Sequence, residues 1–274
     1  MGIILGIDVG GSTTKIVAFR NKDQMLGSLQ VRASDQITSL YGAIGHFTHI
    51  YKISLKDVSK IVITGVGASF VNDDIYGIPT FKVDEFQAIG LGGAMLSKLE
   101  QALVVSMGTG SAYVRVLKDQ ITHIGGSGVG GGSLLGLSSK LINENDIGLI
   151  AAIAEKGDLT KVDLTIQDIS RDLIPKLPPL TTASNFGHIK SEAAKADLAL
   201  GTINMVFQTI GMLAVFACLD TPIRDVVLIG ALTTLPQAET VFGEVGKLYP
   251  INFIIPPHAV FATAIGATVP YLTE

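Results

Sequence analysis

The sequence predicts a mixed α/β protein of two related lobes, and three observations carry this prediction. The 274-residue chain is 47% apolar and only 16% charged, which is typical of a folded protein with a large core. Many of its 31 glycines follow directly after β-like runs. A strand, a glycine turn with hydroxyl side chains and a second strand occur in that order twice. The two hairpins are too far apart for a solenoid repeat, so we expect each lobe to begin with one hairpin whose tip faces a common cleft.

The first lobe is expected to span residues 1–98. Apolar runs that end in glycine or polar turns predict its strands, at residues 3–9, 14–19, 26–31 and 60–65. Helical patterns are expected from about Ile37 to Tyr51 and from about Asp84 to Lys98.

The second lobe is expected to span residues 99–274. Its strands are predicted at residues 103–107, 112–117 and 225–230. A long helical pattern runs from about Ser191 to Leu219, and a final helix is expected from about Ala259 to Val269.

The first glycine turn, GIDVGGSTTKIV at residues 6–17, has the composition of a phosphate-binding hairpin. Glycine lets backbone N–H groups approach a ligand closely, and consecutive N–H groups form a concave anion site. The order of a Walker A loop is absent, and a strand follows where a Rossmann fingerprint needs a helix. We therefore expect the N–H groups, hydroxyls and Lys15 to hold phosphate, with Asp8 near a metal. An Asp-x-Gly-Gly sequence alone is more often a plain turn, yet a carboxylate in an apolar strand needs a partner.

A third glycine-rich segment, residues 125–133, strengthens this interpretation. Glycine occupies most of its positions, which carries a large ordering cost unless a ligand or a backbone must come close. The three glycine turns together predict binding of a nucleoside triphosphate, whereas each turn alone would be a weak signal.

Four motifs in this order resemble the superfamily of acetate kinase, sugar kinases, Hsp70 and actin: residues 6–17, VSMGTGSA at 105–112, GGSGVGGGSLLGL at 125–137 and VVLIGALTTLP at 226–236. Within it, the chain looks like a type II pantothenate kinase. The more specific marks are VDEFQA at residues 83–88, TASNFGH at 182–188 and ATAIGA at 262–267. The resemblance covers essentially the whole chain. It implies a two-lobed actin-like ATPase fold, ribonuclease H-like, with a central ATP cleft.

The same resemblance implies ATP-dependent phosphorylation of the primary alcohol of pantothenate, the first step of coenzyme A synthesis. ATP and Mg²⁺ would be the cofactors, with the metal near Asp8. The residues implied to bind the nucleotide are Asp8, Gly10, Gly11, Ser12, Thr13, Thr14, Lys15, Thr109, Gly110, Gly131, Gly132, Ser133, Leu134, Leu135, Gly230 and Ala231. A homodimer packed through long helices of the second lobe is also implied.

Glu85 and His123 are the residues expected to act on the acceptor. Glu85 matches the family's catalytic acid, and a carboxylate at a helix start could accept the hydroxyl proton or orient the nucleophile. Its alternative is an ordinary exposed charge favoured by the helix dipole, and Asp84 is the fallback base. His123 stands where the family pattern carries an arginine that contacts pantothenate, and imidazole cannot reproduce the guanidinium fork. Either His123 makes a reduced contact, another cation substitutes for the arginine, or the substrate differs. The remaining alternative is a histidine that only fills a loop.

Charge and composition bound the partners and the location. A net charge of −4 gives no basic footprint for nucleic acid. The longest apolar stretch of the C-terminal half, around Ile210 to Leu219, is too short to cross a bilayer, and the N-terminus lacks the pattern of a signal peptide. The only cysteine, Cys218, lies in an apolar segment and allows no internal disulfide. We expect a cytoplasmic protein without membrane or nucleic-acid partners.

Three alternatives stay open at this point. The acceptor could be another small alcohol, such as a sugar or amino sugar. The ATP-driven activators of radical dehydratases share the fold, but they hold an iron–sulfur cluster with paired cysteines, which a single Cys218 does not supply. A nucleotide-binding regulator without turnover is compatible with the histidine at position 123.

Overall fold

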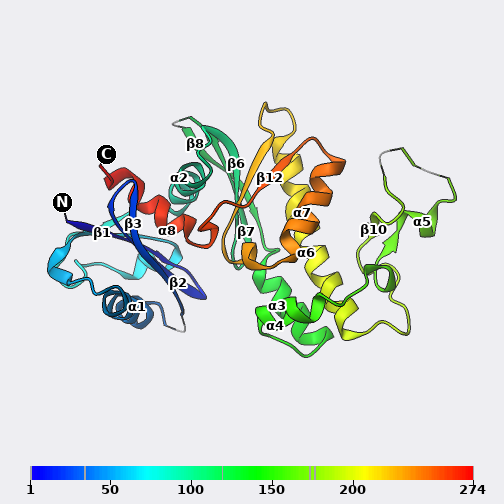
Figure 1. The fold of residues 1–274 in the computed structure, drawn as a ribbon, viewed down its shortest axis with the longest axis horizontal. Helices are drawn as coiled ribbons and strands as arrows, with labels where there is room; N and C mark the ends of the chain where they lie inside the picture. The colour runs from blue at the N-terminus through cyan, green and yellow to red at the C-terminus, as the bar shows by residue number, and fades with distance from the viewer. Residues whose placement is uncertain (1, 34, 119, 173, 176, 274) are drawn as a thin grey trace.

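The chain forms two five-stranded sheets that stand side by side with two helices between them (Figure 1). The computed structural model describes residues 2–33, 35–118, 120–172, 174–175 and 177–273. The arrangement confirms the predicted two-lobed α/β architecture, since each sheet begins with one of the two glycine hairpins.

The first sheet has the strand order β3-β2-β1-β4-β5. Its strands are β1 (Ile3–Val9), β2 (Thr13–Asn21), β3 (Gln24–Arg32), β4 (Val58–Thr64) and β5 (Thr80–Lys82). The first three form an antiparallel meander, while β1, β4 and β5 run parallel. One face is covered by α1 (Gln36–Tyr51), which Asp35 caps by accepting a hydrogen bond from the Thr38 N–H. Because β1 and β4 are parallel neighbours, their carboxyl ends meet at one edge of the sheet.

The other face of the first sheet is covered by α8 (Ala262–Thr268), which comes from the far end of the chain. Gly6 on β1 makes this possible, because a Cβ there would collide with the Ala264 carbonyl. The interface is apolar and includes Ile4, Val17 and Val62 from the sheet and Ile265 from the helix.

The second sheet has the strand order β12-β11-β6-β7-β8. Its strands are β6 (Gln101–Met107), β7 (Ser111–Leu117), β8 (Gln120–Ser127), β11 (Asp225–Ile229) and β12 (Asn252–Ile254). The helices α6 (Lys195–Cys218) and α7 (Gln237–Leu248) cover one face, and α2 (Glu85–Ser97) covers the other. Beyond α6, an arm projects that carries β9 (Leu164–Thr165), α5 (Ile166–Ile169) and β10 (Thr182–Ser184) (Figure 1).

The helices α2 and α8 lie against each other between the two sheets. They touch backbone to backbone, since a Cβ on Gly92 would collide with the Ala262 carbonyl and one on Gly266 with the Ala88 carbonyl. The boundary expected between residues 98 and 99 falls between α2 and β6. As a division into lobes it stays a prediction, because α2 packs on the second sheet and α8 on the first.

Most predicted elements are confirmed, with shifted ends. The last helix is shorter than expected, because 3₁₀ turns at Ala259–Phe261 and Val269–Tyr271 flank α8. The sequence missed β5, β8, β12, α7 and the two helices that precede the arm, α3 (Gly131–Leu141) and α4 (Ile147–Ala154). It also missed the remaining 3₁₀ turns, which cover Leu55–Asp57, Val66–Phe70, Leu159–Lys161 and Ala231–Thr234.

The helix α6 corrects one expectation about membranes. Its 24 residues contain an 18-residue window with a mean hydropathy of 1.7, so the helix is long and apolar enough to cross a bilayer, and the apolar stretch is not too short. However, 61% of its most apolar window is buried inside the protein. Core helices pass the same test of length and composition, and Phe207 and Ile210 of α6 lie in the core beneath the second sheet.

Candidate active site

A buried ion pair marks the edge of the first sheet. Asp8 and Lys15 lie directly opposite each other on β1 and β2, and the Lys15 Nζ lies 3.1 Å from the Asp8 Oδ2. Their side chains are only 9% and 11% exposed, respectively. Strand alternation puts Asp8 on the same face as Gly6, the face toward α8 and the second sheet. The expected partner for a carboxylate in an apolar strand is therefore Lys15.

The tip of this first hairpin is open. The Gly10 N–H donates to the Thr13 carbonyl over 3.0 Å, whereas Gly11 and Ser12 are exposed, and a Cβ on Gly11 would meet no atom within 4 Å. Thr14 differs from the other tip residues. It pairs with Val9, so its buried side chain lies on the sheet face away from Asp8 and Lys15. Its predicted contact with triphosphate stays a prediction and would have to come from the backbone.

The tips of the two hairpins meet. The Ser12 Oγ lies 3.4 Å from the Thr109 Oγ1, although 97 positions separate them in the sequence. The second hairpin closes tightly, with the Gly108 N–H donating to the Gly110 carbonyl over 2.9 Å. The structure thus brings the first two glycine turns together, as the repeated pattern predicted.

The third glycine segment packs onto the second hairpin. The N–H groups of Gly131 and Gly132 donate to the carbonyls of Gly108 and Thr109, each over 2.9 Å. A Cβ on Gly130 would lie 2.7 Å from the Thr109 carbonyl oxygen. These glycines are therefore required by close backbone contact within the protein. Their role in binding nucleotide, as predicted from the sequence, is an additional one that stays a prediction.

The remaining predicted nucleotide residues surround this contact. The Ser133 Oγ donates to the Gly128 carbonyl over 2.9 Å. Leu134 is fully buried in the core of the second sheet, and Leu135 packs against the same core. Gly230 needs its positive φ of 97° at the end of β11, where a Cβ would lie 2.7 Å from the Met107 carbonyl oxygen. Ala231 follows it in a 3₁₀ turn.

Glu85 is the first residue of α2. Asp84 caps the helix, its Oδ1 accepting hydrogen bonds of 3.0 Å from the N–H groups of Phe86 and Gln87. Burial raises the pKa of Glu85 above its ordinary value, and the charges of Asp8 and Asp84 raise it further while Lys15 opposes them. Glu85 therefore lies within the electrostatic reach of Asp8 and Lys15. A carboxylate with a raised pKa is typical of a group that accepts a proton near neutral pH.

His123 lies on strand β8, not in a loop, which corrects the loop alternative. Its ring stacks on Phe86, the residue after Glu85, with centroids 3.7 Å apart and planes 11° from parallel. The stack joins the exposed face of β8 to the first turn of α2. His123 therefore contacts the residue that follows Glu85 in the sequence. This stacking contact with Phe86 orients its imidazole ring.

Thr64 is a site residue that sequence reasoning missed. It ends β4 directly opposite Asp8 in the parallel register, and it is fully buried. Its Oγ1 has no hydrogen-bond partner among the residues that the structure describes. The sequence treated residues 60–65 only as a strand, and a register between distant strands could not be derived from it.

The segment TASNFGH at residues 182–188 lies on the projecting arm and its base. The buried carboxylate of Asp163 accepts hydrogen bonds from the Thr182 Oγ1 over 3.0 Å and the Phe186 N–H over 2.9 Å. It also accepts one from Asn204 on α6 over 2.9 Å. This network anchors the arm to α6, which is a structural role that the motif alone did not reveal.

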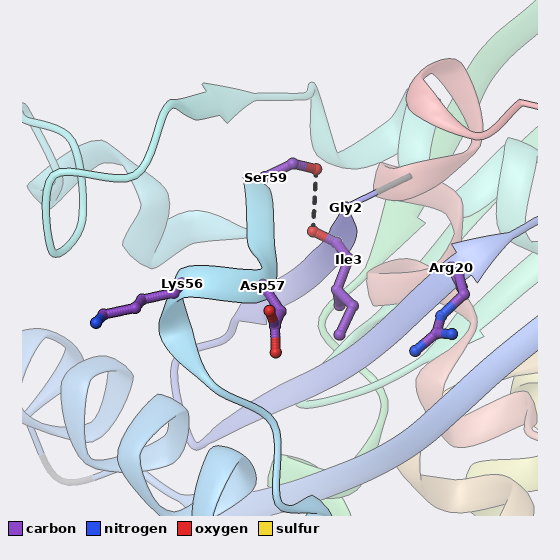
Figure 2. A pocket seen from close by; sticks show the side chains of 6 residues that line it. All are labelled: Gly2, Ile3, Arg20, Lys56, Asp57 and Ser59. Atoms are coloured by element: carbon purple, nitrogen blue, oxygen red, sulfur yellow. Dashed lines mark hydrogen bonds between the residues drawn. The ribbon is translucent and has the colours of Figure 1, made fainter.

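A surface pocket lies away from this site. A cavity of about 500 Å³ is lined by Gly2, Ile3, Arg20, Lys56, Asp57 and Ser59 (Figure 2). These residues lie at or just before the beginnings of β1 and β4 and near the end of β2, whereas Asp8 and Thr64 lie at the ends of β1 and β4. The cavity is therefore at the opposite edge of the sheet from the candidate site.

No group of three or more histidine, cysteine, aspartate or glutamate side chains that could hold a metal is found among the described residues. The site offers one carboxylate, Asp8, with Glu85 near it. This donor set fits Mg²⁺, which usually binds one or two carboxylates together with substrate phosphates and water. It does not fit a structural zinc site.

Known proteins are similar in sequence and in fold. A family model described as Fumble matches residues 95–238, more than half of the chain. A type II pantothenate kinase of Staphylococcus epidermidis is 26% identical over 236 residues, which cover 83% of this chain and 84% of that protein.

Two solved structures share the fold. Component A of (R)-2-hydroxyglutaryl-CoA dehydratase from Acidaminococcus fermentans superposes with a TM-score of 0.69 at 16% identity, covering 99% of this chain and 98% of that chain. A ROK family glucokinase from Streptomyces griseus, in complex with glucose and AMPPNP, superposes with a TM-score of 0.63 at 12% identity, covering 97% of this chain and 98% of that chain. These likenesses confirm the expected actin-like ATPase fold.

Proposed function

The chain belongs to the Fumble family, and on that premise we propose that it is a kinase that transfers the γ-phosphate of ATP to the primary hydroxyl of pantothenate. The observation that carries the proposal is the position of Glu85. The segment that leads to it is hydrogen-bonded to β4, through Val83 and Ile63, and the charges of Asp8 and Lys15 act on the Glu85 carboxylate. Phosphoryl transfer needs donors around the phosphates and a carboxylate for the acceptor, and this arrangement offers both.

The first hairpin is the proposed grip on the triphosphate. Its tip offers exposed backbone at Gly11 and Ser12, and Lys15 offers an ammonium group. The second hairpin would contribute Thr109 from the opposite side, since its hydroxyl already lies near that of Ser12. Gly230 and Ala231 end the neighbouring strand and would lie near the adenosine.

Asp8 is the residue proposed to hold Mg²⁺. When bound, the cation would neutralise charge that develops on the phosphate oxygens. The Asp8 carboxylate is now paired with Lys15, and a phosphate oxygen is the natural alternative partner for the Lys15 ammonium group. The pair therefore keeps both side chains in place and compensated before nucleotide binds.

Glu85 is the proposed base. As the acceptor oxygen forms its bond to the γ-phosphorus, the bond to the β-phosphate oxygen breaks and the hydroxyl proton passes to a Glu85 oxygen. A raised pKa suits this task, because the carboxylate is a stronger base and accepts a proton more readily. Lys15 limits the rise, since its charge favours the ionised form.

His123 is proposed to line the acceptor site together with Phe86. The stacked rings offer a flat apolar surface next to Glu85, and the imidazole adds one hydrogen-bonding nitrogen. This contact is weaker than the bidentate contact of an arginine. We expect a higher KM for pantothenate than an arginine at this position would give.

A homodimer in the cytoplasm is also proposed. The chain exposes Leu213, Phe216 and Leu219 along the last turns of α6, and a second copy packed on this helix would cover them. Light scattering of the purified protein would test the dimer, and a Phe216→Glu variant should be monomeric if the proposal holds. If the two copies associate through another face, the Phe216→Glu variant should stay dimeric, which would contradict the proposed interface.

The activity is tested by coupling ADP release to a panel of acceptors: pantothenate, N-substituted pantothenamides and common sugars. Pantothenate should give a phosphorylated product that mass spectrometry identifies. Product from a sugar and none from pantothenate would overturn the substrate assignment and leave the kinase assignment standing. ATP binding without transfer to any acceptor would favour a regulator.

The Glu85→Gln variant tests the base. It should bind ATP as the wild type does and lose turnover by about 10²- to 10⁴-fold, because it cannot take the proton. Glu155→Gln, an exposed glutamate at the end of α4, is the matched control and should keep full turnover. A Glu85→Gln variant with normal turnover would contradict the assignment.

A further inference from the structure

Three side chains form a row at the carboxyl edge of the first sheet. Following the strand order, Lys15 lies on β2, Asp8 on β1 and Thr64 on β4. The next position belongs to the segment after β5, where the Val83 N–H donates to the Ile63 carbonyl over 3.0 Å, two residues before Glu85. Thr64 therefore occupies the strand position between the Asp8 carboxylate and the segment that carries Glu85.

The hydroxyl of Thr64 is buried without a hydrogen-bond partner among the described residues. The residue is completely buried, and its Oγ1 makes no hydrogen bond to any part of the chain that the structure describes. Burying a hydroxyl without a partner is unfavourable, and valine would fill the same volume without that cost. The position therefore retains a polar group that the nucleotide-free structure does not require.

The backbone after Thr64 fixes its place against Asp8. Gly65 adopts a positive φ of 87°, and a Cβ there would lie 2.6 Å from the Asp8 Oδ1 and 2.7 Å from the Val9 carbonyl oxygen. The backbone at Gly65, which leads into the 3₁₀ segment Val66–Phe70, therefore packs closely against the Asp8 carboxylate. The Asp8 Oδ2 is bound to Lys15, so Thr64 and Gly65 flank the other side of Asp8.

We propose that Thr64 is a positioning residue for the divalent cation at Asp8, its hydroxyl binding a water ligand of that cation on the side toward Glu85. Hydrated Mg²⁺ keeps several water ligands, and these need hydrogen-bond partners from the protein. The inference rests on the proposed function for the placement of the cation at Asp8. It adds a protein contact that neither the glycine turns nor the ion pair provides.

A second buried hydroxyl, on Thr14, makes the choice of Thr64 specific. The Thr14 Oγ1 also lacks a partner within the described chain, but it lies on the opposite face of the sheet, paired with Val9. Of these two threonines, Thr64 alone lies on the sheet face that carries Asp8 and Lys15, because Thr64 pairs with Asp8 in the register of β1 and β4.

The test measures binding of Mn²⁺ to the full chain in the presence of ADP by electron paramagnetic resonance, with no acceptor alcohol. Thr64→Val should weaken Mn²⁺ binding about 10-fold, the usual effect of removing a group that orients a metal's ligands. Thr64→Ser keeps the hydroxyl and should bind within about threefold of the wild type. Ser138→Ala removes another buried, unpartnered hydroxyl far along α3 and should leave Mn²⁺ binding unchanged.

Thermal unfolding of the metal-free proteins supplies the second readout. Thr64→Val should unfold at the same temperature as the wild type or higher, because it removes an uncompensated hydroxyl. If this variant does not fold, Thr64→Ala replaces it in the same comparison. Wild-type Mn²⁺ binding in the Val or Ala variant overturns the proposal, and so does equally weak binding in the Ser variant. A chain that fails to phosphorylate pantothenate would overturn the proposed substrate and leave this result unaffected.

Discussion

The two glycine hairpins share a backbone pattern and differ in what they hold. In the first, Asp8 and Lys15 face each other one step before the turn, and the tip is open. In the second, Ser106 and Ala112 occupy the corresponding step, and the tip is covered by the third glycine segment. The first turn is therefore a charged, accessible site, whereas the second packs against the protein through its backbone and leaves the Thr109 side chain exposed.

This difference separates two uses of glycine. At Gly11 nothing nearby demands a glycine, so the residue leaves room for a ligand. At Gly110 a Cβ would lie 2.7 Å from the Ser127 carbonyl oxygen, so the residue leaves room for the protein itself. A sequence pattern alone treats both turns as phosphate sites, because both have the same composition.

The largest expected effect comes from changing the residue pair next to the last one before the turn in each hairpin, Asp8–Lys15 in the first and Ser106–Ala112 in the second. Asp8→Asn should lower kcat/KM for ATP by about 100- to 1,000-fold, since it removes the carboxylate proposed to hold the cation. Ser106→Ala, the corresponding change in the second hairpin, should alter kcat/KM less than about threefold. Steady-state kinetics of both variants checks the contrast. Equal losses would show that the two hairpins contribute alike.

Removal of the Lys15 ammonium should lower the stability of the nucleotide-free protein. Lys15→Met leaves the Asp8 carboxylate buried without its partner, which costs roughly 3 kcal/mol in the free energy of unfolding. The Tm of the nucleotide-free protein should fall by about 6 to 12 °C. The double variant Asp8→Asn with Lys15→Met should recover most of that loss. If the two changes were simply additive, the ion pair would carry no coupling.

Crowding at the two tips gives an intermediate effect. Gly130→Ala places a methyl group against the Thr109 carbonyl and should cost roughly 1 to 3 kcal/mol in the free energy of unfolding. Gly11→Ala meets open space and should change it by less than about 0.5 kcal/mol. Urea denaturation of both variants measures the difference. Comparable losses would contradict the distinction between a covered tip and an open one.

The smallest expected effect concerns Glu85 and pH. Because its pKa is raised in the folded protein, ionised Glu85 lowers the free energy of unfolding above that pKa, and the penalty disappears below the ordinary value of 4.5. Glu85→Gln should therefore unfold at slightly higher urea concentration than the wild type at neutral pH. The advantage should vanish in acid. A variant less stable than the wild type at neutral pH would contradict the sign.

The sequence was informative where function depends on local pattern. The hairpin around Asp8, the helix that starts at Glu85 and the strand that ends at Gly230 could all be predicted from short stretches. The partner of Asp8 and the place of Thr64 depend on strand register, which joins residues far apart and leaves no local signal. The strand β8 was missed because its glycines resemble a loop, although Gly125 and Gly126 pair with β7.

The packing of α8 on β1 has a consequence for the order of synthesis. Ile3–Val9 leaves the ribosome long before Ala262–Thr268, but its inner face is covered only when that helix follows. Until then Ile4, Val17 and Val62 face water, so the strand that carries Asp8 cannot reach its final packing during most of translation. The nascent chain must therefore complete its nucleotide site after the second sheet has been made. Ribosome-stalled chains that end before residue 262 should bind no nucleotide, however well their second sheet has folded.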